Sequence, residues 1–130
     1  MNPWQAAALL VLAASASMAA GPAPGDPARG EALYGRCQAC HALAYNRTGP
    51  MHCGLFGRRA GGVAGFTYSA AMVESQIIWD SASLDRFLAD PTGVVPGTSM
   101  GYAGVDNAQE RADLIAWLKQ ATATASECAR

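Results

Sequence analysis

The segment "RCQACHAL" at residues 36–43 places two cysteines three positions apart, with a histidine directly after the second. Cys37, Cys40 and His41 can all bind a metal, and the two thiols can also form covalent bonds. The fold depends on what this motif holds. The segments that follow it are long, rich in glycine and poor in either helical or strand periodicity, and such loops are uncommon in a small domain unless they wrap a ligand.

Four interpretations of the motif differ in what they require. A structural zinc site needs four ligands, usually in two spaced pairs, but His52 and Cys53 are adjacent. A redox-active dithiol needs a surrounding βαβ pattern, which the sequence lacks, and two merely buried cysteines would be a coincidence. In the fourth interpretation both thiols form thioethers with one haem, and the histidine that follows presents its imidazole to the iron.

A low-spin haem also needs a sixth ligand on the opposite face. The candidates are Met51, His52, Met72 and Met100. Met51 and His52 follow His41 closely and should stay on its side of the haem. Met100 lies in the irregular loop "VPGTSMGY", which can fold over the far face, so it is the predicted ligand.

Length and charge restrict the class of protein. The chain has 130 residues, enough for one domain, and a formal net charge of −1 without a basic stripe, so nucleic-acid binding is not expected. Its first charged residue is Asp26, after an apolar run of small residues. We therefore predict a secretory signal over 1–19, a flexible leader over 20–26 and one domain over 27–130. An uncleaved membrane anchor is the alternative for the first segment.

Helix signals occur at both ends of this domain and at two short segments between them. Asp26 and Pro27 form an N-cap and first-turn pair, which predicts a helix from Pro27 towards Cys40. Further helices are expected over 69–75, over 81–90, where Pro91 ends the helix, and over 107–125. No segment reads convincingly as a strand, so the predicted fold class is all-α.

Several motifs occur together in one order: "GEALY", "CQACH", "RTGPMHCGLFGRRAG", "GFTYS", "IIWD", "LADP", "VPGTSM" and "ERADLIAWLKQAT". On these motifs the chain resembles the class I monohaem c-type cytochromes of mitochondria and bacteria. The resemblance implies the cytochrome c fold, in which N- and C-terminal helices cross and short helices and long loops wrap one covalent haem c. At the crossing, Gly30 and Tyr34 would meet the C-terminal helix.

The resemblance also implies a role for each residue of the site. His41 and Met100 would be the axial ligands, and the Pro50 carbonyl would accept a hydrogen bond from His41. The remaining haem-binding positions are the thioether cysteines and the side chains around the propionates: Cys37, Cys40, Arg58, Tyr68, Trp79 and Thr98. The role of His52 stays open. Cys53 and Cys128 remain as a pair, and we expect them to form a disulfide in an oxidising compartment.

The implied function is one-electron transfer in the bacterial periplasm, not enzymatic catalysis. The expected partners are redox proteins: a membrane respiratory complex, an oxidase or a periplasmic dehydrogenase. The carrier would be a monomer that meets the membrane only through these partners. Two alternatives are a haem protein whose labile methionine exposes the iron to peroxide or nitric oxide, and a permanent subunit of a larger oxidoreductase.

Overall fold

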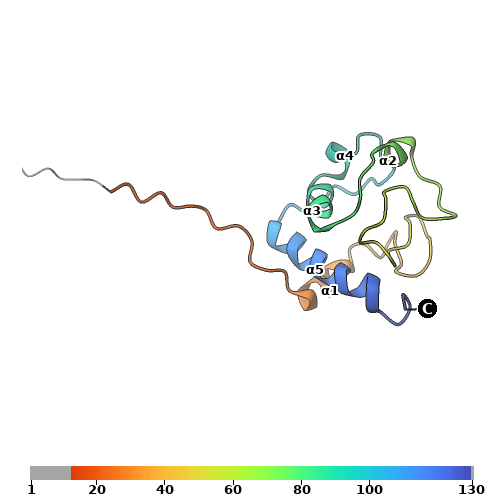
Figure 1. Cartoon of the computed structure of the whole chain (residues 1–130), viewed down its shortest axis with the longest axis horizontal. Coiled ribbons are helices and arrows are strands. Elements are labelled where there is room, and N and C mark those ends of the chain that lie inside the picture. Colours follow the sequence, from red (N-terminus) through yellow and green to blue (C-terminus); the bar gives the residue numbers. More distant parts are fainter. Residues whose placement is uncertain (1–12, 130) are drawn as a thin grey trace, which may run out of the picture.

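The computed structural model describes residues 13–129 and is built from helices and long loops (Figure 1). The helices are α1 (Pro27–Tyr34), α2 (Ala70–Glu74), α3 (Ser81–Ala89), α4 (Pro91–Val94) and α5 (Ala108–Thr124). Over these described residues the only β pairing is an isolated antiparallel bridge between Arg59 and Ile78. The all-α prediction is confirmed.

Helices α1 and α5 cross each other in close contact, as expected from the sequence (Figure 1). A Cβ atom on Gly30 would stand 2.0 Å from the carbonyl oxygen of Asp113 and 2.8 Å from the Cβ of Trp117. Only glycine therefore lets the two backbones approach this far. Tyr34, one turn later in α1, is buried and packs its ring on Trp117 with the ring centres 4.4 Å apart.

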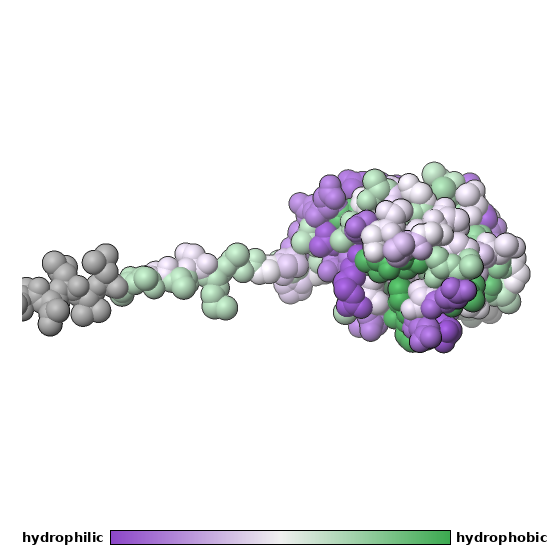
Figure 2. Space-filling model, turned by 90° about the horizontal axis from the view of Figure 1, so that it is seen from above, coloured by the Kyte–Doolittle hydropathy of each residue, from purple (hydrophilic) through white to green (hydrophobic). Residues whose placement is uncertain are grey.

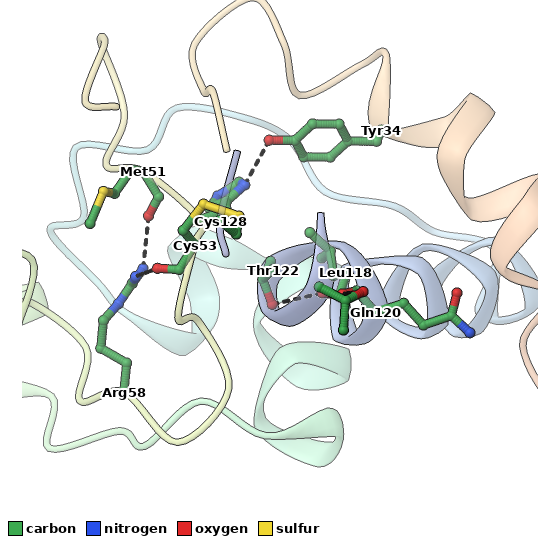
Figure 3. Close-up of a disulfide and its surroundings, with 10 residues drawn as sticks. Tyr34, Met51, Cys53, Arg58, Leu118, Gln120, Thr122 and Cys128 are labelled. Carbon is green, nitrogen blue, oxygen red and sulfur yellow. Dashed lines mark hydrogen bonds between the residues drawn. A yellow bond between two sulfur atoms is a disulfide. The ribbon is translucent and has the colours of Figure 1, made fainter. Parts of the chain in front are cut away.

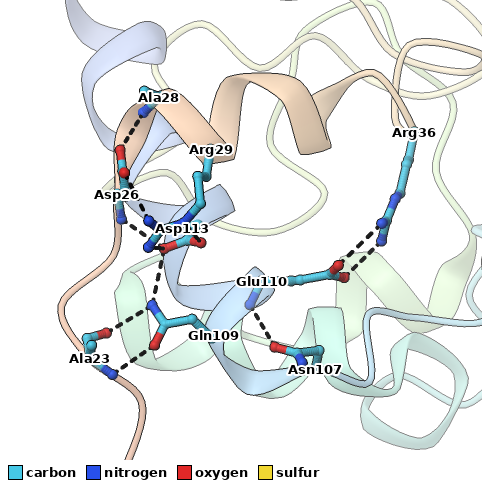
Figure 4. Close-up of polar contacts among 9 residues, drawn as sticks. All are labelled: Ala23, Asp26, Ala28, Arg29, Arg36, Asn107, Gln109, Glu110 and Asp113. Carbon is cyan, nitrogen blue, oxygen red and sulfur yellow. Dashed lines mark hydrogen bonds and ion pairs between the residues drawn. The ribbon is translucent and has the colours of Figure 1, made fainter.

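Polar contacts anchor the start of α1 to α5 (Figure 4). The buried Asp113 carboxylate accepts hydrogen bonds from the Asp26 backbone N–H at 2.8 Å and from Arg29 Nε at 2.8 Å. These donors, Arg29 first, hold the pKa of Asp113 well below its usual range. Upstream, the Ala23 N–H and carbonyl both bond the Gln109 amide. The segment expected as a flexible leader thus contacts α5 from Ala23 onward.

Helix α1 is shorter than predicted, because it ends at Tyr34 and not near Cys40. Gly35, a poor helix former, follows, and the hydrogen bonds change to the tighter i→i+3 pattern. The Cys37 N–H bonds the Tyr34 carbonyl at 2.8 Å, and the Cys40 N–H bonds the Cys37 carbonyl at 3.1 Å. The cysteine motif therefore lies on a series of turns directly after the helix.

The loop expected over 91–106 contains a short helix that we did not predict. Asp90 ends α3 and also caps α4, where its side chain accepts from the Gly93 N–H at 3.0 Å. The Asp90–Pro91 pair repeats the N-cap and first-turn signal of Asp26–Pro27. The same pattern would therefore have predicted α4.

The hydrophobic core lies between the α1–α5 crossing, α3 and the loops. On α5 the predicted apolar stripe buries Leu114, Leu118 and Ala121, while Trp117 is partly buried. Asn107 caps this helix by accepting from the Glu110 N–H at 2.9 Å. The long loop over 41–69 is tied to the rest of the fold by backbone bonds, such as Gly57 N–H to the Trp79 carbonyl at 2.8 Å and Gly54 N–H to the Thr122 carbonyl at 2.9 Å.

The predicted signal segment over 1–19 lies mostly outside the described residues. From residue 13 to the start of α1 the chain has no regular secondary structure, and the part before Ala23 extends away from the domain (Figure 1). In the described part of the chain, no helix combines the length and the apolar character needed to cross a bilayer.

Candidate functional site

A cavity of about 500 Å³ lies between the cysteine motif, the long loops and α5. Most of its wall is apolar, from Leu55, Phe66, Leu84, Phe87, Leu88, Leu114 and Leu118 among others. A hollow of this character, with hydrophobic side chains between hydrophilic ones, is seen on one face of the molecule (Figure 2). All the residues predicted to bind the cofactor or its iron line this one cavity: Cys37, Cys40, His41, Pro50, Arg58, Tyr68, Trp79, Thr98 and Met100.

The cysteine motif presents one imidazole and two free thiols to this cavity. The His41 Nδ1 lies 2.8 Å from the Pro50 carbonyl oxygen, so Nδ1–H donates this bond and Nε2 is left free to ligate a metal. Burial lowers the pKa of His41, although the bond to Pro50 opposes this effect. Among residues 13–129, no three or more His, Cys, Asp or Glu side chains are grouped to hold a metal ion.

Two methionines line the cavity, whereas Met51 is not part of its wall. Met100 lies in the loop after α4, where its N–H donates to Thr98 Oγ1 at 3.2 Å. Met72 belongs to α2 and is buried. Met100 is thus available as the predicted ligand, and Met72 is a second thioether on the wall of the same cavity.

Arg58 brings a buried positive charge to the cavity wall. Its two terminal nitrogens donate to the backbone carbonyls of Cys53 and Met51, both at 3.0 Å. Its Nε is the one buried side-chain nitrogen or oxygen without a hydrogen-bond partner in the described part of the chain. Burial lowers the pKa of this guanidinium. A carboxylate in the cavity, such as a haem propionate, would supply the missing partner, so the residues present fit the predicted group.

Tyr68 and Trp79, two other side chains predicted near the propionates, already make contacts within the protein. The Tyr68 hydroxyl accepts a hydrogen bond from the Val63 N–H at 3.1 Å, and its ring packs edge-on against Phe66. Trp79 is buried against Phe87, with the ring centres 5.1 Å apart. Both side chains therefore help to build the apolar wall in addition to any polar contact they make.

His52, whose role the sequence left open, lies on the cavity wall and not on the outer surface alone. Its ring stacks on that of His41, with the ring centres 4.3 Å apart and the planes inclined by 21°. Its Nδ1 lies 3.0 Å from the Tyr34 hydroxyl. Burial first, and then the nearby His41 ring and the Arg58 guanidinium, lower the pKa of His52 to about 3, so the ring is neutral at pH 7.

Next to His52, the structure pairs Cys53 with Cys128 in a disulfide (Figure 3). The two Cα atoms are 5.2 Å apart and the cysteines are separated by 75 residues. The bond joins the segment after Pro50 to the chain just beyond α5. It therefore ties one wall of the cavity to the C-terminal helix.

A second, wider hollow of about 860 Å³ lies behind His41, between α1, the loop over 42–47 and the end of α5. Tyr34, His41 and Trp117 are on its wall. One side of His41 therefore faces this hollow.

Comparisons with known proteins agree with this geometry. The family model described as Cytochrome c matches residues 27–122. A cytochrome c2 of Rhodomicrobium vannielii is 44% identical over 114 residues, covering 85% of this chain and 87% of that protein. A cytochrome c2 of Blastochloris viridis is 42% identical over 122 residues, covering 92% and 94%. The solved structure of cytochrome cH from Methylobacterium extorquens is 41% identical, with a TM-score of 0.72, and covers 74% of this chain and 99% of that one.

Proposed function

The chain belongs to the cytochrome c family, and from this premise we propose that it is a periplasmic electron carrier with a low-spin haem held by His41 and Met100. Family membership makes it an electron-transfer protein, not an enzyme, with one covalently bound haem c. The periplasmic location rests on the predicted signal over 1–19, on a leader over 20–26 before the domain over 27–130, and on the need for haem attachment outside the cytoplasm.

The observation that carries the proposed ligation is the common cavity. His41 and Met100 are far apart in sequence, yet both line it together with Cys37 and Cys40. The bound haem supplies an iron that cycles between Fe(II) and Fe(III). The chain contributes the imidazole of His41, oriented by the Pro50 carbonyl, and a soft thioether that favours Fe(II).

The side chains of the cavity restrict access of substrate and water to the iron and favour one oxidation state. With His41 and Met100 both holding the iron, no coordination position would remain open for a substrate. The apolar wall excludes water and so favours the less charged ferrous form. Arg58 would hold a propionate through its unpaired Nε–H, and its positive charge would favour the ionised form of that carboxylate.

Partner association should depend little on charge. Lys119 is the sole lysine of the chain. Two of the arginines that could form a basic patch are already engaged, Arg36 with Glu110 at 2.9 Å and Arg58 inside the cavity wall. We propose a monomer that exchanges electrons with a membrane respiratory complex, an oxidase or a periplasmic dehydrogenase through short-range contacts.

The ligation is tested by comparing Met100→Ala with Met72→Ala, since both side chains line the cavity. The weak band at the red end of the ferric visible spectrum reports methionine–iron ligation. Met100→Ala should lose the band while the colour stays bound to the chain after acid–acetone extraction. Met72→Ala should keep the band. Loss of the band in Met72→Ala alone would contradict the assignment, and extraction of all colour from the wild type would contradict covalent attachment.

A further inference from the structure

Three neighbours control the position of the His41 imidazole in the structure. The Pro50 carbonyl accepts from Nδ1 at 2.8 Å. The backbone of Gly49 lies against the ring, because a Cβ there would stand 2.3 Å from Cε1 and 2.6 Å from both ring nitrogens. The third neighbour is the stacked ring of His52. The Pro50 bond holds one atom of the ring, so the contacts against its face decide how far the ring can rotate about the Cβ–Cγ bond.

His52 is itself held from several directions. Its backbone N–H bonds the carbonyls of Ala42 and Leu43 at 3.2 and 3.0 Å. Its side chain bonds the hydroxyl of Tyr34, which is 3% exposed and packs at a tilt against Trp117 of α5. The residue that follows His52 is fixed to the C-terminus by the disulfide. A ring held this firmly can restrict the orientation of its neighbour.

The chemistry of the stack suits this role. The two imidazole rings lie 4.3 Å apart between centres with their planes inclined by only 21°, and the His52 Nδ1 lies 3.0 Å from the Tyr34 hydroxyl. A planar ring held in this way covers one face of the His41 ring. A branched aliphatic side chain would fill the same volume but could neither stack as a plane nor bond Tyr34. The wide hollow behind His41 leaves fewer other groups to restrain the ring.

We propose that His52 is a positioning residue that sets the rotational orientation of the His41 ring, with Tyr34 as its support. The inference rests on the proposed function, because it takes His41 to be an axial ligand. A fixed ligand plane keeps the geometry of the site the same in both oxidation states. Such a plane lowers the reorganisation that accompanies electron transfer.

The test uses the intact holoprotein and three substitutions. His52→Leu removes both the planar stack and the hydrogen bond, His52→Phe restores a planar ring without the bond, and Tyr34→Phe removes only the hydroxyl. The neighbouring Met51→Leu, outside the cavity wall, is the control. In the ferric state, the hyperfine-shifted proton resonances of the four haem methyl groups report the orientation of the axial imidazole. The visible red band and urea unfolding are recorded for each variant.

His52→Leu should shift the haem-methyl resonances and change their order while the red band is retained. His52→Phe should return them towards the wild-type pattern, Tyr34→Phe should move them less and in the same direction as His52→Leu, and Met51→Leu should leave them unchanged. A wild-type methyl pattern in His52→Leu, whatever its stability, would overturn this inference alone. A high-spin ferric spectrum in the wild-type protein would overturn the proposed ligation together with it.

Discussion

Replacing Gly30 by alanine tests the helix crossing that closes the fold. The added Cβ would stand 2.0 Å from the Asp113 carbonyl oxygen, and Cβ atoms do not approach closer than about 3.0 Å, so α1 and α5 must separate locally by about 1 Å. The obstructing atoms belong to the backbone and cannot rotate away.

The magnitude follows from two opposing effects. Overpacking a close contact costs up to about 3 kcal/mol, and a rigid obstruction lies at the upper end of that range. Alanine in place of glycine inside a helix returns about 1 kcal/mol. The free energy of unfolding should therefore fall by about 2 kcal/mol. With a slope of about 2 kcal/mol per molar urea, the unfolding midpoint should fall by about 1 M.

Urea unfolding of the holoprotein at pH 7, followed by far-ultraviolet circular dichroism, measures this loss. Gly35→Ala is a matched control at the end of the same helix, because its Cβ would meet nothing closer than the Ala32 carbonyl oxygen at 3.2 Å. The control should change stability by no more than about 0.5 kcal/mol. Equal losses in the two variants, or an unchanged midpoint in Gly30→Ala, would refute the steric explanation.

Three further predictions concern the disulfide, acid stability and partner binding. Changing Cys53 and Cys128 together to serine should lower the free energy of unfolding by about 4 kcal/mol, as the chain-entropy model gives for a loop of 75 residues. An unchanged urea midpoint would contradict this. The pKa of Asp113 is lower in the folded state than in the unfolded state, where it is about 3.9. The ionised carboxylate therefore stabilises the fold above about pH 3.9, and this stabilisation is lost as the pH falls towards the pKa of the folded state. Asp113→Asn should thus be less stable than the wild type at pH 7, and the difference should narrow below about pH 4; a constant difference in urea midpoint down to pH 3 would disprove it. Finally, the second-order rate of electron exchange with a natural partner should change less than about tenfold between low and high ionic strength in stopped-flow experiments, and a steeper fall would show that charge steers the encounter.

The starts of the helices could be predicted because each depends on one or two residues. Asp26 with Pro27, and Asn107 with Glu110, are caps that act locally. The end of α1 could not be placed the same way, because Gly35 tolerates both the α-helical and the tighter turn pattern. The tighter turn pattern is adopted because the cysteine motif that follows Gly35 turns towards the cavity, which depends on the tertiary structure.

Motif order predicted a set of haem-site residues, and all of them line one cavity, but their mutual contacts could not be predicted. The stack of His52 on His41 depends on how the loop after Pro50 folds back. The unpaired Nε of Arg58 depends on which carbonyls its other nitrogens reach. Both features depend on how segments that are separate in the sequence pack against each other. The spacing of residues along the chain therefore does not predict them.

The disulfide also has a consequence for how the protein is made. If the protein is exported as proposed, Cys37 and Cys40 must stay reduced until the haem is attached, while Cys53 and Cys128 must be oxidised in the same compartment. Cys128 lies 75 residues after Cys53 and beyond α5, so in a chain exported N-terminus first the bond between them cannot close until α5 has been translocated. By then Cys37 and Cys40 have already crossed, and a premature bond between any two of the early cysteines must be avoided or reversed. In an exported chain, the separation of Cys128 from Cys53 would therefore delay the disulfide until after Cys37 and Cys40 are available for haem attachment.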